Sequence, residues 1–557
     1  MIRPVLPLVR RHAHKFGWAV LAFTVLFWRL GATSFWDPDE AHYAETTREM
    51  LATGDWLTPR YNDQPFFDKP VFFHWLQALP MAALGPTETA ARLVPALACL
   101  ALIGVTWWVG AVLVSAETGF IAALLLTTNA AVFALARYAI LDSVFAALLF
   151  GGAASVTVAA LANRPRLQYA GYVLIALATL TKGPVAIVLC GLPFLVAIAL
   201  SVDARRKLLG LRWVLGLAIV LAIATPWYVY MLAVHGRAFV DGYFLNENVL
   251  LFSRPLYAGQ PGWWFYLQIV LLALLPWTGL LLGRLYDDVR TLRTKRMQLD
   301  AFELLLWLWV ASIVGFFSLS QFKLDHYVFP AAPALCLLIA RGWTEMRARE
   351  HHRLAIGVRV GWHTVGPCLA IAGIVIGVLT LYRLDVPEAA LVMSASLTAV
   401  GLVLSLMPIR VARAARAPWL AAAALGVLYA GALVWILPVL ESQKVVPGIA
   451  RWVARRAGGN ERVATYILNR WEPSFRFYFG GHVEMLEGPD TAAAFFDAPE
   501  PFYCVMRRSS YHQLVAQGAP LRIVHAHHGL WATSGMALWR DRPEATQFVV
   551  VTHSKRR

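Results

Sequence analysis

The sequence contains little charge for its length. Charged residues make up only 15% of the 557 positions, whereas 59% are hydrophobic and 22 are tryptophan. A transmembrane helix needs about 20 predominantly apolar residues, and segments of that kind recur along the chain. This composition excludes a soluble enzyme and predicts an integral membrane protein.

Cysteine is also scarce, and its placement excludes two kinds of stabilisation in the C-terminal region. Cys504 is the only thiol there, because Cys99, Cys190, Cys336 and Cys368 lie in apolar segments. An internal disulfide is therefore excluded in that region. The chain also has no C-x-x-C or H-x-x-x-H spacing that would indicate structural zinc.

The positive charge of the chain does not indicate a nucleic-acid partner. The formal net charge is +16, but the basic residues are distributed between the apolar segments rather than gathered in one domain. No small-residue cleavage site follows the first apolar segment. We therefore expect that segment to be retained as a membrane span.

Thirteen apolar segments predict an α-helical polytopic protein with about thirteen transmembrane helices. Lys and Arg are concentrated in alternate connections, such as 205–212 and 284–296. The positive-inside rule then places the N-terminus in the cytoplasm and the C-terminus on the outer side. The segments lie at approximately 16–35, 89–114, 119–136, 143–162, 168–181, 184–201, 213–234, 263–283, 301–319, 328–342, 361–382, 390–407 and 418–438.

The chain is predicted to divide into two domains at about residue 440. Residues 1–439 form the transmembrane domain, and its longer outward segments, 36–88 and 235–262, are rich in polar and aromatic residues. The first of them predicts two interfacial helices, which begin near Pro38 and Pro70 and end at Gly54 and Gly85.

The second domain, residues 440–557, is predicted to be a small α/β domain on the outer face. Short strands are expected at 463–467, 483–486 and 502–506, with a helix at 510–517. A region of this size can bury a core of its own.

The acidic run after the first apolar segment is the most informative motif. Asp37 can cap a helix that begins at Pro38, and Glu40 can complete a D-x-x-E capping box. Capping leaves Asp39 without a structural role. An ionisable group that faces the interior of a membrane protein is a candidate functional residue. Asp39 is therefore the leading candidate for a catalytic residue.

Further polar residues recur at the same outward level. Each alone is more often an interface anchor or a snorkelling side chain. Together they place several acids and cations at one membrane surface, which suits a general acid or base beside a phosphate clamp. These residues are Lys69, Asp142, Lys182, Lys323, Asp325, His326 and Tyr327.

The same motifs, in this order, resemble one family. They are similar to the bacterial relatives of the protein O-mannosyltransferases, above all the lipid A 4-amino-4-deoxy-L-arabinose transferases, and the similarity runs from about residue 16 to 440. This resemblance implies the GT-C fold. It is carried by Trp36-Asp37-Pro38-Asp39-Glu40, Phe67-Asp68-Lys69-Pro70, Tyr138-Ala139-Ile140-Leu141-Asp142, Thr181-Lys182-Gly183 and Lys323-Leu324-Asp325-His326-Tyr327.

The resemblance implies an inverting glycosyltransferase of the inner membrane that acts at the periplasmic face. The donor would be 4-amino-4-deoxy-L-arabinose carried on undecaprenyl phosphate, and the acceptor would be lipid A. Another sugar, or another lipid, glycan or protein acceptor, remains the alternative. We expect a monomer that needs no cofactor. A divalent metal is not supported by the sequence.

Roles follow from the resemblance residue by residue. Asp39 would be the acid nearest the reaction centre, and Asp142 and Glu40 complete the predicted catalytic set. Lys69 would hold the donor phosphate, and Tyr43 would shape the pocket. The remaining expected substrate-binding residues are Arg254, Tyr327, Lys182, Lys323 and His326.

The sequence also departs from the family pattern. Arg254 stands a few residues beyond the position of a family arginine, and Asp325 replaces a proline. Asp68 occupies a position where some relatives have glutamate, so a metal site built from Asp68 and His235 is only a weak candidate.

Two other classes of protein stay open at this point. A transporter would show internal repeats and charged or broken helices near the membrane midplane, but we find no convincing repeat. A sensor or scaffold would not need acids and lysines gathered at one face.

Overall fold

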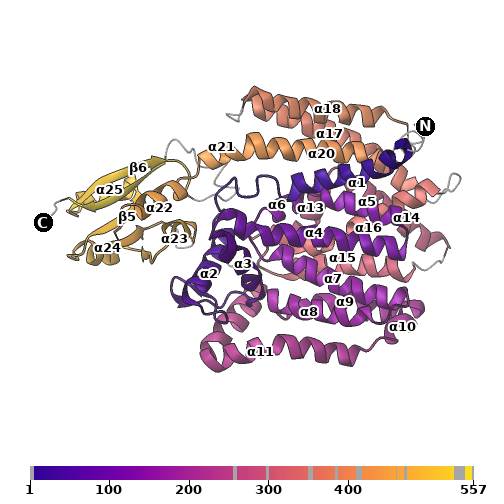
Figure 1. Cartoon of the computed structure of the whole chain (residues 1–557), viewed down its shortest axis with the longest axis horizontal. Helices are drawn as coiled ribbons and strands as arrows, with labels where there is room; N and C mark the ends of the chain where they lie inside the picture. The colour runs from indigo at the N-terminus through magenta and orange to yellow at the C-terminus, as the bar shows by residue number, and fades with distance from the viewer. Residues whose placement is uncertain are drawn as a thin grey trace.

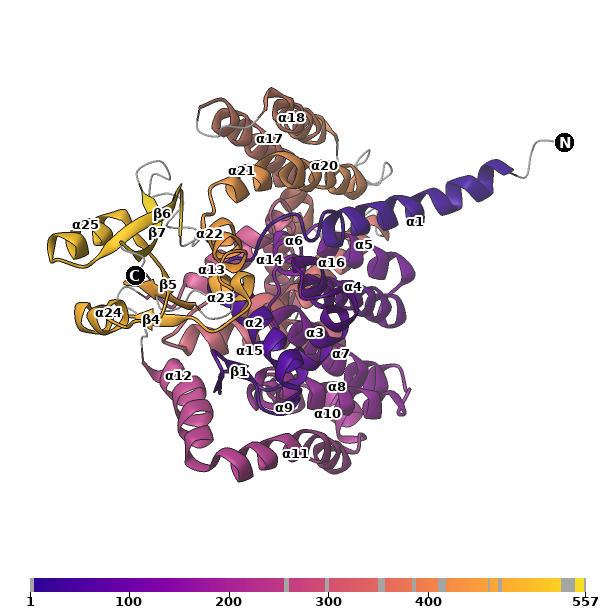
Figure 2. The same ribbon diagram turned by 60° about the vertical axis from the view of Figure 1, so that its left-hand side comes forward.

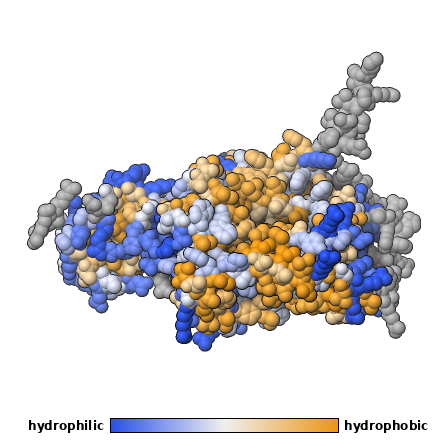
Figure 3. All heavy atoms as spheres, turned by 60° about the horizontal axis from the view of Figure 1, so that its bottom comes forward, coloured by the Kyte–Doolittle hydropathy of each residue, from blue (hydrophilic) through white to orange (hydrophobic). Residues whose placement is uncertain are grey.

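The computed structural model describes residues 5–254, 260–295, 300–348, 356–382, 387–408, 417–458, 461–468, 473–531 and 546–554. A bundle of long helices forms one part of the molecule, and a small sheet with its own helices lies beyond one end of the bundle (Figure 1). An apolar belt surrounds the bundle on the face shown in Figure 3, while the sheet region is mostly hydrophilic.

Each of the thirteen predicted apolar segments contains a helix, although the first helix ends at Leu26, before the predicted end at residue 35. They correspond to α1 (Val5–Leu26), α4 (Glu88–Leu113), α5 (Ala116–Thr127) with α6 (Ala130–Ala136), α7 (Asp142–Leu161), α8 (Leu167–Lys182), α9 (Val185–Leu200), α11 (Trp213–Phe239), α13 (Phe265–Ala273) with α14 (Thr278–Lys295), α15 (Ala301–Leu319), α16 (Ala332–Ala348), α17 (Ile356–Tyr382), α18 (Leu391–Leu406) and α20 (Pro418–Gly431).

Fewer than thirteen of the described helices are both long enough and apolar enough to cross a membrane by themselves. In the part of the chain that the structure describes, eight helices are long and apolar enough to cross a membrane. The number rises to ten if α5 with α6, bent by 62°, and α13 with α14, bent by 115°, each make one span. The helical membrane fold is therefore confirmed, whereas the count of thirteen spans stays a prediction.

Close packing within the bundle uses small residues. A Cβ atom added to Gly283 of α14 would lie 2.1 Å from the carbonyl oxygen of Gly357 on α17, and one added to Gly361 would lie 2.1 Å from that of Gly279. Such spacing of small residues four apart lets two backbones approach, as it does between transmembrane helices.

The remaining elements outside the sheet region are shorter. Helices α2 (Asp39–Thr53) and α3 (Phe72–Leu84) end before Gly54 and Gly85, which have φ values of 70° and 78°, so both predicted helices are confirmed, while their interfacial position stays a prediction. The other short elements are β1 (Arg60–Tyr61), β2 (Gln64–Pro65), α10 (Val202–Leu209), η1 (Val240–Leu250), α12 (Leu251–Ser253), η2 (Asp325–Ala331), η4 (Glu388–Ala390), η5 (Ala432–Ile436) and α21 (Leu437–Ser442). Figure 2 shows α12 standing away from the bundle beyond α11.

The capping prediction for α2 is wrong. The residue before the helix is Pro38, and no side chain caps the helix. The Asp37 carboxylate instead accepts a hydrogen bond of 2.9 Å from the backbone N–H of Ser474, and a second from the Ser474 hydroxyl. Asp37 therefore joins the bundle to the sheet region rather than starting α2.

The C-terminal region contains a five-stranded sheet in the order β4-β3-β5-β7-β6. Strands β3 (Arg462–Tyr466), β4 (Glu484–Leu486) and β5 (Phe502–Arg507) are parallel, whereas β7 (Gln547–His553) pairs antiparallel with β5 and with β6 (Leu521–His528). The helices of this region are α22 (Val446–Ala454), α23 (Pro473–Phe479), α24 (Pro489–Phe496) and α25 (Arg508–Ala516). The predicted α/β organisation is confirmed, although β6 and β7 were not predicted.

Each face of the sheet has its own apolar core, because successive side chains of a strand point to opposite faces. Cys504 and Met506 of β5 pack with Phe495 of α24, whereas Val505 packs with Phe475 of α23. Helix α23 is consequently held between the sheet and the bundle, where it approaches α2 (Figure 1).

Candidate active site

A cavity of about 1410 Å³ lies where α2, the N-terminus of α7, the C-terminus of α8, η1 and η2 meet the sheet region. Ten of the twelve residues that the sequence predicted for the site line it, and Glu40 and His235 do not. The ten are Asp39, Tyr43, Asp68, Lys69, Asp142, Lys182, Arg254, Lys323, His326 and Tyr327. Their individual roles remain predictions.

Asp39 is the first residue of α2 and faces this cavity. Within the described part of the chain its carboxylate has no hydrogen-bond or ion-pair partner. Burial raises the pKa of Asp39, and the nearby Asp68 and Asp142 raise it further, while His326 and Lys69 oppose them. An unpaired carboxylate of raised pKa is suited to accept a proton from a substrate.

Lys69 is held by two carboxylates. Its Nζ lies 2.5 Å from Oδ1 of Asp68 and 3.0 Å from Oε2 of Glu247 on η1. The Tyr43 hydroxyl donates a hydrogen bond of 3.4 Å to the other oxygen of Asp68. Asp68 and Glu247 raise the pKa of Lys69 against the effect of burial, so its ammonium group is charged and fixed in position at the cavity wall.

A second cation of the cavity wall lies at the end of α8. Lys182 forms an ion pair with Asp142, the first residue of α7, and its Nζ lies 4.3 Å from the centre of the Tyr327 ring. The other oxygen of Asp142 is 3.5 Å from Nε2 of His326. The His326 ring also lies 3.2 Å from Asp325 through Nδ1, so two carboxylates orient this imidazole.

Two further cations lie in the same wall. Arg254 is exposed, and its backbone N–H donates a hydrogen bond to the carbonyl oxygen of Leu250. Lys323 donates from Nζ to the carbonyl oxygen of Ser320. The cavity thus combines one free carboxylate with several cations, of which two are anchored by carboxylates.

The catalytic assignment of Glu40 is not supported by its position. Glu40 is fully buried and paired with Arg92 of α4, with 2.5 Å between Oε1 and Nε. Its oxygens also accept hydrogen bonds of 2.9 Å from the backbone N–H groups of Trp36 and Ala139. A carboxylate that is saturated in this way and lies outside the cavity stabilises the entry to α2.

The weak metal candidate is not assembled either. Nε2 of His235 lies 3.1 Å from the Thr58 hydroxyl, while Asp68 is engaged by Lys69. Among the residues that the structure describes, no three His, Cys, Asp or Glu side chains are grouped so as to hold a metal ion. The donor set around Asp68 therefore does not fit a metal.

Several cavity residues were not assigned from the sequence. Glu247 lies in the outward segment 235–262, and only the fold shows that it reaches Lys69. His42 follows Asp39 by less than one turn of α2, and burial lowers its pKa to about 4. The sheet region supplies Ile467, Pro473 and Glu487, and no local signal in the sequence marks these residues.

Comparisons with known proteins place this geometry in a family context. The family model of dolichyl-phosphate-mannose-protein mannosyltransferases matches residues 17–239. The undecaprenyl phosphate-alpha-4-amino-4-deoxy-L-arabinose arabinosyl transferase of Edwardsiella ictaluri is 30% identical over 335 residues, which span 58% of this chain and 59% of that protein.

A crystal structure of ArnT from Cupriavidus metallidurans bound to undecaprenyl phosphate superposes with a TM-score of 0.73 at 24% identity, covering 96% of this chain and 98% of that one. The chain has the fold of ArnT. The archaeal oligosaccharyltransferase AglB from Archaeoglobus fulgidus is similar at a lower level, with a TM-score of 0.50, 12% identity, and coverage of 90% and 70%. The resemblance inferred from the motifs and the GT-C fold are thus confirmed.

Proposed function

We propose that this protein is an inverting glycosyltransferase that moves 4-amino-4-deoxy-L-arabinose from undecaprenyl phosphate to lipid A. The observation that carries this proposal is the unpaired carboxylate of Asp39 in a cavity that Lys69 and Lys182 also line. The names of the similar proteins support the sugar and the carrier. The acceptor is inferred from the family resemblance.

The donor phosphate would occupy the region between Lys69 and Lys182. Both ammonium groups are fixed by carboxylates before any ligand arrives, so little reorganisation accompanies the reaction. As the bond between the anomeric carbon and the phosphate oxygen breaks, that oxygen keeps the electron pair. Fixed cations beside it stabilise the developing charge.

Asp39 would act on the acceptor from the other face of the sugar. The acceptor oxygen forms the new bond to the anomeric carbon on the side opposite the leaving phosphate, which inverts the configuration. Asp39 orients the acceptor oxygen and, if that oxygen is protonated, accepts its proton. His326 and Lys182 hold Asp142 beside the same space, so Asp142 shapes the acceptor region without being free itself.

The proposed location is the bacterial inner membrane, with a cytoplasmic N-terminus. The transmembrane domain would comprise residues 1–439, and residues 440–557 would form a periplasmic domain that closes the cavity from outside. Apolar helices and the basic connections support this arrangement. Reporter fusions after residues 60, 290 and 445 test it, since 60 and 445 should report the periplasm and 290 the cytoplasm.

The decisive experiment is transfer by purified protein. Wild type and Asp39→Asn are incubated in detergent with undecaprenyl-phosphate-linked aminoarabinose and lipid A, and the intact lipids are analysed by mass spectrometry. We expect the mass of one aminoarabinose residue on lipid A with wild type only. Intact-lipid spectra of cells with and without the gene identify the product independently. A different added mass, or a different modified lipid, would replace the proposed sugar or acceptor.

A further inference from the structure

Helix α23 of the sheet region contacts the chain on both sides of Asp39, at Asp37 just before α2 and at Glu45 within α2. Before Asp39, the Asp37 carboxylate accepts hydrogen bonds from the backbone N–H and the hydroxyl of Ser474. After it, Nε of Arg476 lies 2.8 Å from Oε1 of Glu45. The residue that carries the proposed chemistry is therefore bracketed by contacts to a segment more than 400 positions away.

Arg476 is the centre of this interface. Its side chain is 5% exposed, and the Glu45 carboxylate that it meets is completely buried. Its Nη2 atom also lies 2.9 Å from Glu49, one turn further along α2, and 3.3 Å from Asp63 in the loop after α2. One planar guanidinium thus joins three carboxylates, a geometry that a lysine ammonium cannot reproduce.

The opposite face of α2 rests on the bundle. There the Thr47 hydroxyl hydrogen bonds with Nδ1 of His74 and Oε1 of Gln77, both on α3. Helix α2 is consequently held between α3 and α23, and both contacts determine its rotation about its own axis. Because Asp39 is its first residue, a small rotation displaces the carboxylate relative to Lys69 and Lys182.

We propose that Arg476 and Ser474 are positioning residues for Asp39, so that the sheet region takes part in turnover by fixing the catalytic helix. Pro473, the first residue of α23, lines the cavity and brings the same helix to the substrate space. This inference rests on the proposed function, because it assigns α23 to the reaction in which Asp39 acts. A displacement of about 1 Å in a reacting group can cost roughly a hundredfold in rate.

A neighbouring ion pair between the same two regions provides the matched control. Arg451 of α22 lies 3.2 Å from Glu88 at the start of α4, and the Arg451 side chain is 53% exposed. This pair also crosses between the sheet region and the bundle, but it does not touch α2. Loss of general adhesion between the regions would affect Arg451→Ala and Arg476→Ala alike, whereas loss of positioning would affect only Arg476→Ala.

The kinetic experiment compares wild type with Arg476→Ala, Arg476→Lys, Ser474→Ala and Arg451→Ala, using the donor and acceptor that wild type accepts. We expect Arg476→Ala to lower kcat about ten- to hundredfold, while the Kd for undecaprenyl phosphate stays within about threefold because Lys69 and Lys182 are untouched. Arg476→Lys should recover part of kcat, and Arg451→Ala should match wild type. The proposal is overturned by unchanged kcat in Arg476→Ala, by a parallel loss of carrier affinity, or by an equal loss in Arg451→Ala.

Two provisions keep the test decisive. Where Arg476→Ala does not yield folded protein, Arg476→Lys and Ser474→Ala carry the same comparison, with an expected loss of about three- to tenfold in kcat. Hydrogen exchange of residues 39–53 adds a readout that needs no substrate: α2 should exchange faster in Arg476→Ala, and α3 should not. Inactive wild type would refute the proposed function, whereas an active wild type with unaltered α2 exchange in Arg476→Ala would refute only this inference.

Discussion

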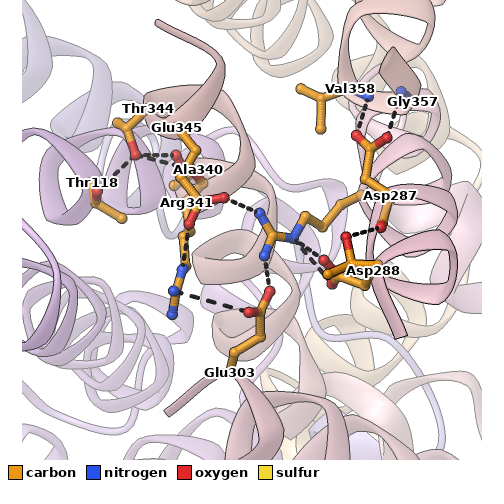
Figure 4. Close-up of polar contacts among 12 residues, drawn as sticks. Thr118, Asp287, Asp288, Glu303, Ala340, Arg341, Thr344, Glu345, Gly357 and Val358 are labelled. Carbon is orange, nitrogen blue, oxygen red and sulfur yellow. Dashed lines mark hydrogen bonds and ion pairs between the residues drawn. The ribbon is translucent and has the colours of Figure 1, made fainter. Parts of the chain in front are cut away.

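Two clusters of buried charge, at opposite ends of the helical bundle, look alike in sequence and differ in structure. One lines the cavity around Asp39. The other surrounds Arg284 of α14, which lies 3.0 Å from Asp288 and 2.7 Å from Glu345 and also contacts Glu303. Figure 4 shows Asp288, Glu303 and Glu345 arranged about one guanidinium group. Glu345 lies about 20 Å along α16 from the end nearest the cavity, at 1.5 Å per residue.

The cluster around Arg284 is closed by its own partners. Arg341 bridges Glu345 at 2.9 Å and also contacts Asp300, while Asp287 accepts hydrogen bonds from the backbone N–H groups of Gly357 and Val358. These contacts join α14, α15, α16 and α17 to one another. The residues of this cluster do not line the cavity of the candidate site.

The cluster around Asp39 also combines acids with cations, but among the described residues it leaves one carboxylate unpaired. Lys69 and Lys182 are paired, while Asp39 faces space that a substrate can fill. The comparison teaches that buried charge alone does not indicate function, since a saturated network holds helices together. A free carboxylate beside fixed cations in a cavity is the arrangement that can do chemistry.

The strongest test of this contrast is Asp39→Asn. Asparagine keeps the shape but cannot take a proton, so we expect kcat to fall about 10²- to 10⁴-fold with thermal stability at least equal to that of wild type. Turnover by purified protein and thermal unfolding in detergent measure both. Asp37→Asn is the control, because its amide can still accept from the Ser474 N–H and donate to the Ser474 hydroxyl. Near-normal turnover in folded Asp39→Asn would remove this residue from the reaction.

The opposite end of the bundle should respond to mutation in stability rather than in activity. Arg284→Ala leaves Asp288 buried without its cation and leaves Glu303 with only Arg341, at 3.9 Å. Breaking a buried pair in this way costs about 3–5 kcal/mol. We expect a lower unfolding temperature, with the Kd for undecaprenyl phosphate unchanged in the protein that remains folded. A folded Arg284→Ala variant that lost carrier affinity would show that the two clusters are coupled.

Lys69→Ala should have an intermediate effect, on binding. A hydrogen bond to a charged group is typically worth about 1.5–3 kcal/mol, which corresponds to roughly ten- to hundredfold in affinity. We expect undecaprenyl phosphate to bind more weakly by that factor, and Lys69→Arg to recover only part because its fork must fit between Asp68 and Glu247. Titration of undecaprenyl phosphate into the purified wild type and variants measures this affinity. Unchanged affinity would move the phosphate site towards Lys182.

Local signals in the sequence were sufficient for much of this picture. Gly54 and Gly85 ended the two interfacial helices as expected, because a glycine with positive φ is the common stop of a helix. The charged residues gathered at one level, such as Lys69 and Lys182, also line one cavity. These predictions needed only the order of apolar segments and the turn residues between them.

The capping prediction for Asp37 and Glu40 was wrong because both side chains have partners in distant parts of the chain. Glu40 is paired with Arg92, 52 positions away, and Asp37 with Ser474, 437 positions away. A capping box is a local pattern, and nothing in it reveals that a stronger long-range partner competes for the same carboxylates. Glu247 escaped assignment for the same reason, since only the fold brings η1 to Lys69.

The smallest expected effect is the pH dependence of stability that the buried carboxyl group of Asp37 causes. Burial raises the pKa of Asp37 to about 6, despite the opposing hydrogen bonds from Ser474. The ionised form is therefore disfavoured in the folded state, and the stability of wild type should decline as the pH rises from about 4 through about 6. Asp37→Asn carries no charge, so it should match wild type at pH 4 and unfold a few degrees higher at pH 7.5.

Asp63→Asn serves as the counterpart of opposite sign. The His482 ring lies 2.9 Å from the Asp63 carboxylate, and its hydrogen bond lowers the pKa of Asp63. The ionised carboxylate of Asp63 stabilises the folded state at pH values above its ordinary pKa, and this contribution is lost as the pH falls through the lowered pKa of the folded state. Asp63→Asn lacks this contribution, so it should be slightly less stable than wild type at pH 7.5. Unfolding temperatures at pH 4 to 8 measure both variants. If Asp37→Asn were instead the less stable protein at pH 7.5, the Ser474 contacts would outweigh burial, and Asp37 would belong with the closed, structural charges.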